Sequence, residues 1–228
     1  MIPKIIHQTG PEESKWHPIW KECSQSWKNT FPDFQYMYWT DDDLRNLVKE
    51  KYSEFLELYD SFNYHIMRVD FARFCILHSC GGIYADLDFY CHENFYHLLK
   101  KDLYIVESWP EWKERVQNSL MISSPNHAFW KKCMKHSQNS FNNLNSNHLI
   151  NEDYNDYILS TCGPKLISKI LDPSVKILPK HMFNPWIGIQ FNWSKSEDDQ
   201  IYKLCLEYFN KAKTENKCFT THFLTGTW

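Results

Sequence analysis

The fold is decided by the run IMRVDFARFCILHSC (residues 66–80) and the run GGIYADLD (residues 81–88) that follows it directly. The first run is apolar nearly all round, which predicts a helix that is buried on most faces. The pair Gly81-Gly82 ends this helix, and Ile83-Tyr84-Ala85 predicts a short interior strand. Asp86 and Asp88 therefore come at the point where a buried strand ends.

The sequence on the N-terminal side of this stretch alternates strand and helix patterns. Residues 4–8 read as a strand that Gly10-Pro11 closes, and Trp16, Trp20, Cys23 and Trp27 then follow at helical spacing. Residues 34–39 predict a second strand, and Thr40 with Asp43 three positions later predicts a capped helix start. The chain thus opens as β-α-β-α.

The C-terminal side continues this alternation, with strands at 103–106, 119–122 and 175–178 and helices at 164–170 and around 199–213. Residues 137–153 are rich in Asn and Ser and predict a mobile loop or an insertion between helices. Alternating strands and helices indicate an α/β fold with a mainly parallel central sheet. At 228 residues the chain suits a single domain.

Composition excludes several classes of function. The formal charge is −3 and no basic run stands out, so nucleic acid is not an expected partner. No stretch approaches the roughly 20 apolar residues of a membrane span, and the opening lacks a signal-peptide pattern. We therefore expect a cytoplasmic protein, in the host-cell cytoplasm if it is viral. The eight cysteines include no C-x-x-C pair, which favours reduced thiols over a disulfide or zinc framework.

A D-x-D triplet is weak evidence by itself, because 14 aspartates in a chain of this length give about 0.9 such triplets by chance. The triplet Asp41-Asp42-Asp43 lies at a predicted helix start, where carboxylates satisfy free N–H groups. Asp86-Leu87-Asp88 lies instead at the edge of the sheet where α/β proteins bind ligands. Its two carboxylates share one face, about 6–7 Å apart, and suit a hard cation. A solvated strand end is the competing interpretation.

A second pair supports a site. Asp70 and Arg73 are three residues apart, so they are neighbours on one face of the mostly apolar helix and are expected to be partly buried. An internal ion pair without function explains them equally well.

These residues together resemble a known family. Arg68-Val-Asp70-Phe-Ala-Arg73, Leu77 and the GGIYADLD run resemble the signature of glycosyltransferase family 32, the DXD sugar-transferase group. The opening IPKIIHQ, the segment Thr161-Cys-Gly163-Pro164 and the ending from His222 to Trp228 resemble further segments of that family, with Thr227 in place of its usual Ser. The family includes initiating α-1,6-mannosyltransferases, inositol-phosphoceramide mannosyltransferases and capsular polysaccharide enzymes.

The resemblance implies a GT-A type, Rossmann-like domain over residues 1–228, with a donor-binding portion at about 1–125 and an acceptor and lid portion at about 126–228. It implies Mn²⁺ (or Mg²⁺) as the cofactor, ligated by Asp88 and Asp86, with His222 as a further ligand. Donor binding would fall to His7, Gln8, Thr9, Asp70, Arg73, Asp86, Asn118 and Trp228, and an acceptor wall to Trp109 and Trp112.

We therefore expect a metal-dependent transferase that moves a hexose from a UDP- or GDP-linked donor to a glycan, lipid or protein hydroxyl, with retention of configuration. Asp86, Asp88 and Arg73 would carry the chemistry, with Arg73 stabilising the leaving diphosphate. Two alternatives remain open. One is a non-catalytic protein that binds nucleotide sugars or carbohydrates, and the other is a metal-dependent phosphohydrolase that uses the same acids.

Overall fold

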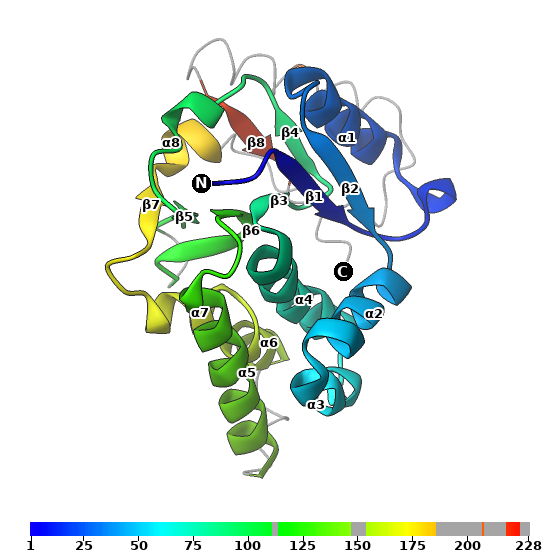
Figure 1. Cartoon of the computed structure of the whole chain (residues 1–228), viewed down its shortest axis with the longest axis vertical. Helices are drawn as coiled ribbons and strands as arrows, with labels where there is room; N and C mark the ends of the chain where they lie inside the picture. The colour runs from blue at the N-terminus through cyan, green and yellow to red at the C-terminus, as the bar shows by residue number, and fades with distance from the viewer. Residues whose placement is uncertain (111–113, 147–153, 186–206, 208–217, 224–228) are drawn as a thin grey trace.

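The computed structural model describes residues 1–110, 114–146, 154–185, 207 and 218–223 of the chain. These residues form three layers, in which helices cover both faces of a central sheet (Figure 1). The predicted α/β class is confirmed.

The central sheet has six strands in the order β2-β1-β3-β6-β5-β7. The pairs β1/β2, β1/β3 and β5/β7 are parallel, whereas β6 runs antiparallel to β3 and to β5 on either side of it. Three of these five pairings are parallel, which agrees with the predicted sheet. The strands are β1 (Ile5–Thr9), β2 (Gln35–Trp39), β3 (Gly82–Ala85), β5 (Leu103–Glu107), β6 (Val116–Ser123) and β7 (Lys176–Leu178).

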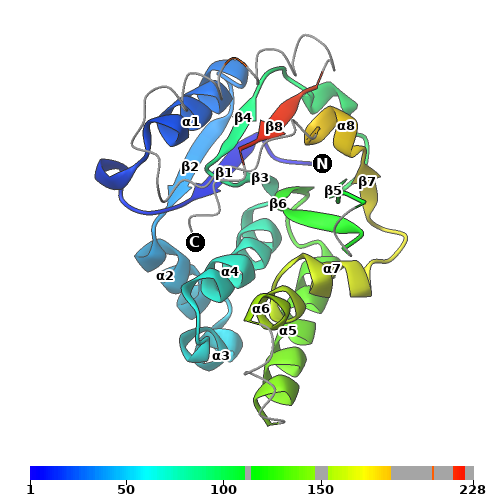
Figure 2. The same ribbon diagram turned by 180° about the vertical axis from the view of Figure 1, so that it is seen from behind.

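Alternation along the strands divides the core into two clusters. Tyr84 of β3 points to one face of the sheet, and its neighbours Ile83 and Ala85 point to the other. The Tyr84 face is covered by α2 (Asp41–Lys51), α3 (Leu56–Ser61), α4 (His65–Cys80), α5 (Ala128–Ser146), α6 (Tyr154–Thr161) and α7 (Pro164–Ile170). The opposite face packs against α1 (Pro18–Thr30) and α8 (Lys180–Phe183) (Figure 2).

Helix α4 is buried along most of its length, as its nearly continuous apolar pattern predicts. It ends at Gly81, whose φ of 64° belongs to the region that glycine adopts without steric cost. A Cβ on Gly81 would lie 2.6 Å from the backbone nitrogen of Pro125, so the turn into β3 has no room for a side chain. This turn fixes where β3 starts and, in consequence, where Asp86 and Asp88 emerge.

A second, two-stranded sheet brings the end of the described chain to the DXD segment. Strand β4 (Phe89–Cys91) follows Asp88 directly and pairs antiparallel with β8 (Thr220–His222). The carbonyl of Asp88 also accepts a hydrogen bond from the backbone N–H of Phe223. Short 3₁₀ turns lie at Glu13–Lys15, Ser53–Phe55 and Tyr96–Leu98.

Most predicted elements are present within two residues of their expected bounds, and Thr40 with Asp43 forms the predicted capping box at the start of α2. The prediction of a loop at 137–153 is wrong for its first part, because α5 continues through Ser146. Its apolar positions, including Phe141, pack on the core and override the low helix propensity of Asn and Ser. The rest of that segment and the predicted helix at 199–213 lie outside the described ranges, apart from Glu207.

Among the helices that the structure describes, none is long and apolar enough to cross a membrane. The cytoplasmic location stays a prediction.

Candidate active site

Three side chains that can ligate a metal meet where β3 ends. Asp86, Asp88 and His222 each place one ligand atom within 4.8 Å of the others. His222 comes from β8, and its Nε2 lies 2.9 Å from Oδ1 of Asp88. The imidazole also stacks on Phe89 with ring centroids 4.4 Å apart, which fixes its orientation. The predicted metal set is thus brought together from two segments more than 130 positions apart in the chain.

Arg73 lies at the centre of a buried ion-pair network beside this cluster. Its Nη1 is 2.8 Å from Asp70 of α4 and its Nη2 is 2.9 Å from Asp86, the residue that follows β3. One guanidinium therefore pairs with both carboxylates. Nη1 also donates to the carbonyl of Asn118, and the side-chain amide of Asn118 donates to Asp70. Arg73 is 2% exposed, so this network is shielded from water.

Tyr84 connects the network to the first strand. Its hydroxyl donates to Asp86 at 2.9 Å, and it also shares a hydrogen bond with Thr9 at 2.9 Å. The ring lies under the guanidinium of Arg73, 5.1 Å from its centroid to Cζ. Asp86 is therefore held from two sides, by the cation of Arg73 and by the phenol of Tyr84.

The charges in this site do not balance. Burial raises the pKa of Asp70 to about 6, and the attraction of Arg73 offsets this effect only in part. Burial likewise raises the pKa of Asp86. Burial lowers the pKa of His222, but the neighbouring Asp88 outweighs it, so the net shift is upward. Three carboxyl groups thus face one arginine and one histidine, so the acidic groups of the site outnumber its basic groups.

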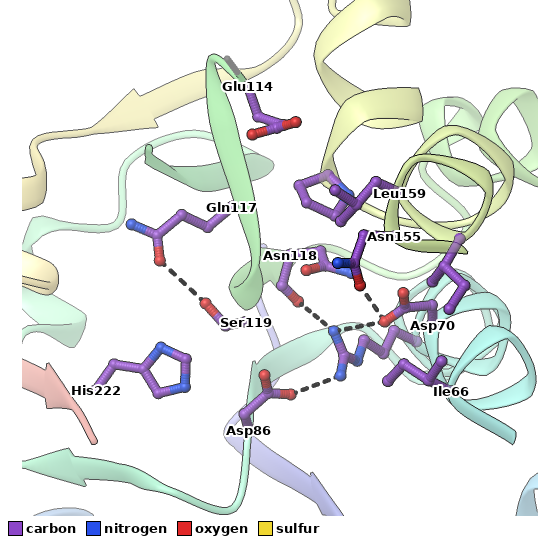
Figure 3. A pocket seen from close by; sticks show the side chains of 13 residues that line it. Ile66, Asp70, Asp86, Glu114, Gln117, Asn118, Ser119, Asn155, Leu159 and His222 are labelled. Carbon is purple, nitrogen blue, oxygen red and sulfur yellow. Dashed lines mark hydrogen bonds and ion pairs between the residues drawn. The ribbon is translucent and has the colours of Figure 1, made fainter. Parts of the chain in front are cut away.

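A cavity of about 580 Å³ opens over these groups (Figure 3). Asp70, Arg73, Asp86 and His222 lie along one part of its wall. The polar side chains Gln117, Asn118 and Ser119 of β6 form another part, and an apolar part consists of Ile66, Ile158, Leu159 and Pro164 from α4, α6 and α7.

The three predicted nucleoside contacts at the end of β1 lie under the site and do not line this cavity. His7 is fully buried, with Nε2–H donating to the carbonyl of Gly81 and Nδ1 accepting from Trp39. Burial lowers the pKa of His7 to about 4, which keeps the ring neutral. Gln8 donates to the backbone carbonyl of Asp86, and Thr9 bonds Tyr84. These contacts hold the DXD segment in place, and a nucleoside contact for these residues stays a prediction.

The other predicted residues divide into two groups. Asn118 does line the cavity, next to Asp70. Trp109 is buried at the end of β5 and is not among the residues that line the cavity. Trp112 and Trp228 lie outside the described residues.

Sequence reasoning missed Gln117 and Ser119, which line the cavity next to Asn118. The available signal was three consecutive polar residues, 117–119, in a buried strand whose other residues are apolar except for Ser123 at its end. Such a polar run in a buried strand needs partners, and a ligand can provide them.

The donor set fits a hard or borderline divalent cation. Two carboxylates and one imidazole suit Mn²⁺, with a ligand's oxygens to complete its coordination. The Nδ1 of His222 is buried and has no hydrogen-bond partner within the described part of the chain, while Nε2 faces Asp88 and is the nitrogen that would ligate the ion.

The fold is of the GT-A type. The solved structure titled PaToxG Glycosyltransferase aligns over 92% of this chain and 78% of its own, with a TM-score of 0.57 at 16% identity. This similarity concerns the fold alone.

The chain is similar to the glycosyltransferases that carry a DXD sugar-binding region, glycosyltransferase family 32. The family model described as the glycosyltransferase sugar-binding region containing DXD motif matches residues 18–108. The mannosyl phosphorylinositol ceramide synthase SUR1 of Saccharomyces cerevisiae is 38% identical over 59% of this chain and 34% of its own length. The inositol phosphoceramide mannosyltransferase 2 of Schizosaccharomyces pombe is 33% identical over 78% of this chain and 49% of its own. The chain therefore spans half or less of the length of these two relatives.

Proposed function

We propose that this protein is a metal-dependent glycosyltransferase that moves a hexose from a UDP- or GDP-linked donor to a hydroxyl of a glycan, lipid or protein acceptor, with retention of configuration. The observation that supports this most is the convergence of Asp86, Asp88 and His222 beside a cavity in a chain with the DXD region. One of these relatives is named a mannosyl phosphorylinositol ceramide synthase and the other an inositol phosphoceramide mannosyltransferase. A mannosyl donor is therefore the first to test.

In this proposal Asp88, Asp86 and His222 hold Mn²⁺ or Mg²⁺. When bound, the ion neutralises the donor diphosphate and acts as a Lewis acid on its oxygens as the bond from sugar to phosphate breaks. Below its pKa, His222 is a cation bonded to Asp88, so binding of the metal requires loss of that proton.

The chain's own residues orient the donor and carry the remaining charge. Arg73 is fixed by Asp70 and Asp86 in a buried site, where its positive charge acts on the leaving diphosphate with little reorganisation. Asp70 and Asn118 line the same part of the cavity and are placed to bind hydroxyl groups of the sugar. The proposal also includes a contact of Trp228 with the donor and an acceptor wall at Trp112.

We also propose that the two portions of the chain bind different substrates. Residues 1–125 contribute β1, α4 and β3 and would bind the donor, whereas residues 126–228 contribute the apolar wall of α6 and α7 and would face the acceptor. His222 is an exception to this division, because it returns from the second portion to the metal set.

The test is turnover of GDP-mannose and of UDP-glucose with Mn²⁺ and with EDTA, measured as release of the nucleoside diphosphate with and without sugar acceptors. We expect Mn²⁺-dependent turnover that Asp88→Asn and Arg73→Met reduce by at least about 100-fold. Asp42→Asn, in the exposed triplet at the start of α2, is the matched control and should be unchanged. Metal-dependent binding without turnover would favour a binding protein. Release of inorganic phosphate from simple phosphoesters would favour a phosphohydrolase.

A further inference from the structure

Gln117, Ser119 and Asn184 form a hydrogen-bonded relay at the edge of the cavity, separate from the DXD network. Gln117 Nε2 donates to the backbone carbonyl of Glu107 at 2.7 Å. Gln117 Oε1 accepts from Asn184 Nδ2 at 2.7 Å and from Ser119 Oγ at 3.1 Å. The three side chains are between 1% and 6% exposed, so their partners are almost entirely within the protein.

The direction of this relay follows from one group that can only accept. The carbonyl of Glu107 has no proton, so the Gln117 side chain must turn its NH₂ toward it. Oε1 then faces the opposite way, and both groups that approach it must donate. The single hydroxyl proton of Ser119 is thereby committed to Gln117. Its oxygen is left with lone pairs only.

Ser119 is also placed where a substrate would lie. It lines the cavity together with Asp86 and His222, and Figure 3 shows it between Gln117 and Asp86. Its backbone carbonyl accepts from the N–H of Asp86 at 2.8 Å, so Ser119 and the first acid of the DXD segment are fixed to each other. A ligand group that contacts Ser119 Oγ is therefore close to the proposed metal set.

We propose that Ser119 Oγ can only accept, and that it accepts a hydrogen bond from a substrate hydroxyl. Gln117 and Asn184 are positioning residues, because they keep the hydroxyl proton of Ser119 directed toward Gln117. The inference rests on the proposed function and assigns a specificity-determining contact to it. A sugar hydroxyl can donate to Ser119, whereas hydrogen or fluorine at the same carbon cannot. The hydroxyl belongs either to the donor hexose or to the acceptor, which share this chemistry.

Calorimetric binding of GDP-mannose, UDP-glucose, GDP and UDP in the presence of Mn²⁺ tests the donor side without requiring turnover. Ser119→Ala should weaken the sugar nucleotide by about three- to tenfold and leave the free nucleoside diphosphate unchanged, as expected for loss of one neutral hydrogen bond. If affinities do not change, the same variant should raise the KM for the acceptor by a similar factor, which assigns the hydroxyl to the acceptor. No change in any of these quantities would overturn the proposal.

Sugar analogues that lack one hydroxyl proton test whether Ser119 accepts a hydrogen bond from the ligand. On the wild-type protein, a deoxyfluoro sugar at the contacted carbon should bind as weakly as the deoxy sugar, because neither donates a proton to Ser119. A deoxyfluoro analogue that binds like the parent would overturn the assignment. Asn184→Ala should weaken the parent sugar less than Ser119→Ala does, since Ser119 keeps its bond to Gln117.

Ser123→Ala is the control for a lost hydroxyl on the same strand. Ser123 is fully buried, accepts from Trp130 and does not line the cavity. This variant should lower the midpoint of thermal unfolding and leave every affinity unchanged. If the wild-type protein binds sugar nucleotides without turning them over, the proposed transferase activity fails while the Ser119 contact is still measured.

Discussion

Replacing Asp70 by Asn should make the protein more stable at pH 8. Asp70 is 4% exposed and shares Arg73 with Asp86, so two carboxylates compete for one cation. Burial raises the pKa of Asp70 to about 6 from an ordinary value of 3.8. Ionising this group therefore costs the folded protein more than the unfolded chain, by about 3 kcal/mol at 1.36 kcal/mol per pKa unit.

The pH dependence follows from the direction of that shift. A carboxyl group whose pKa is raised in the folded state stabilises the fold while it is protonated, below about pH 3.8, and this contribution is lost as the pH rises through 6. The uncharged amide of the Asp70→Asn variant would behave as a permanently protonated Asp70. The two proteins should be equally stable near pH 3, and the variant should be more stable by up to about 3 kcal/mol at pH 8.

The assay is urea denaturation of the two proteins from about pH 3 to pH 8 in EDTA, with the difference in free energy of unfolding plotted against pH. Asp60→Asn is the control. Asp60 is an exposed partner of Arg45 whose pKa the neighbouring arginine lowers, so its loss should destabilise by at most about 1 kcal/mol. A variant Asp70→Asn that is less stable than wild type at pH 8 would refute the reasoning, because Arg73 would then outweigh the cost of burial.

Three further substitutions test other parts of the structure. Tyr84→Phe removes the hydrogen bond to Asp86 and should lower kcat by about tenfold with an unchanged circular dichroism spectrum, and full activity would show that Arg73 suffices to hold the acid. Gly81→Ala places a methyl group against the backbone at positive φ and should cost at least about 2 kcal/mol in urea denaturation, whereas unchanged stability would mean that the turn rearranges freely. Thr40→Ala removes one half of the capping box and should cost about 1 kcal/mol by the same assay, and no loss would mean that Asp41 and Asp42 cap α2 unaided.

The fold was largely predictable because its strands and helices are short and strongly patterned. The run at 66–88 predicted α4, the glycine turn and β3 together, since its polar residues are too few to give either element an exposed face. The antiparallel insertion of β6 was not predictable in this way, because strand direction depends on long-range pairing and leaves no local pattern. Helix α5 was misjudged over 137–146 because packing of its apolar face outweighed composition.

The site was predictable in part. Asp70, Arg73, Asp86 and Asp88 follow from one continuous stretch of sequence, and their proximity follows from the helix-turn-strand geometry. The approach of His222 depends on the pairing of β8 with β4, which no local rule predicts. Tyr84, Gln117 and Ser119 act through hydrogen bonds whose direction appears only when all partners are in place.

The most direct test of the central claim is the binding of Mn²⁺ itself, measured by electron paramagnetic resonance with GDP or UDP present. We expect one bound ion for each chain in the wild-type protein. Asp88→Asn and His222→Ala should each weaken it by at least about tenfold, and Asp42→Asn should leave it unchanged. Equal Mn²⁺ affinity in all four proteins would contradict the assignment of Asp86, Asp88 and His222 as the metal site.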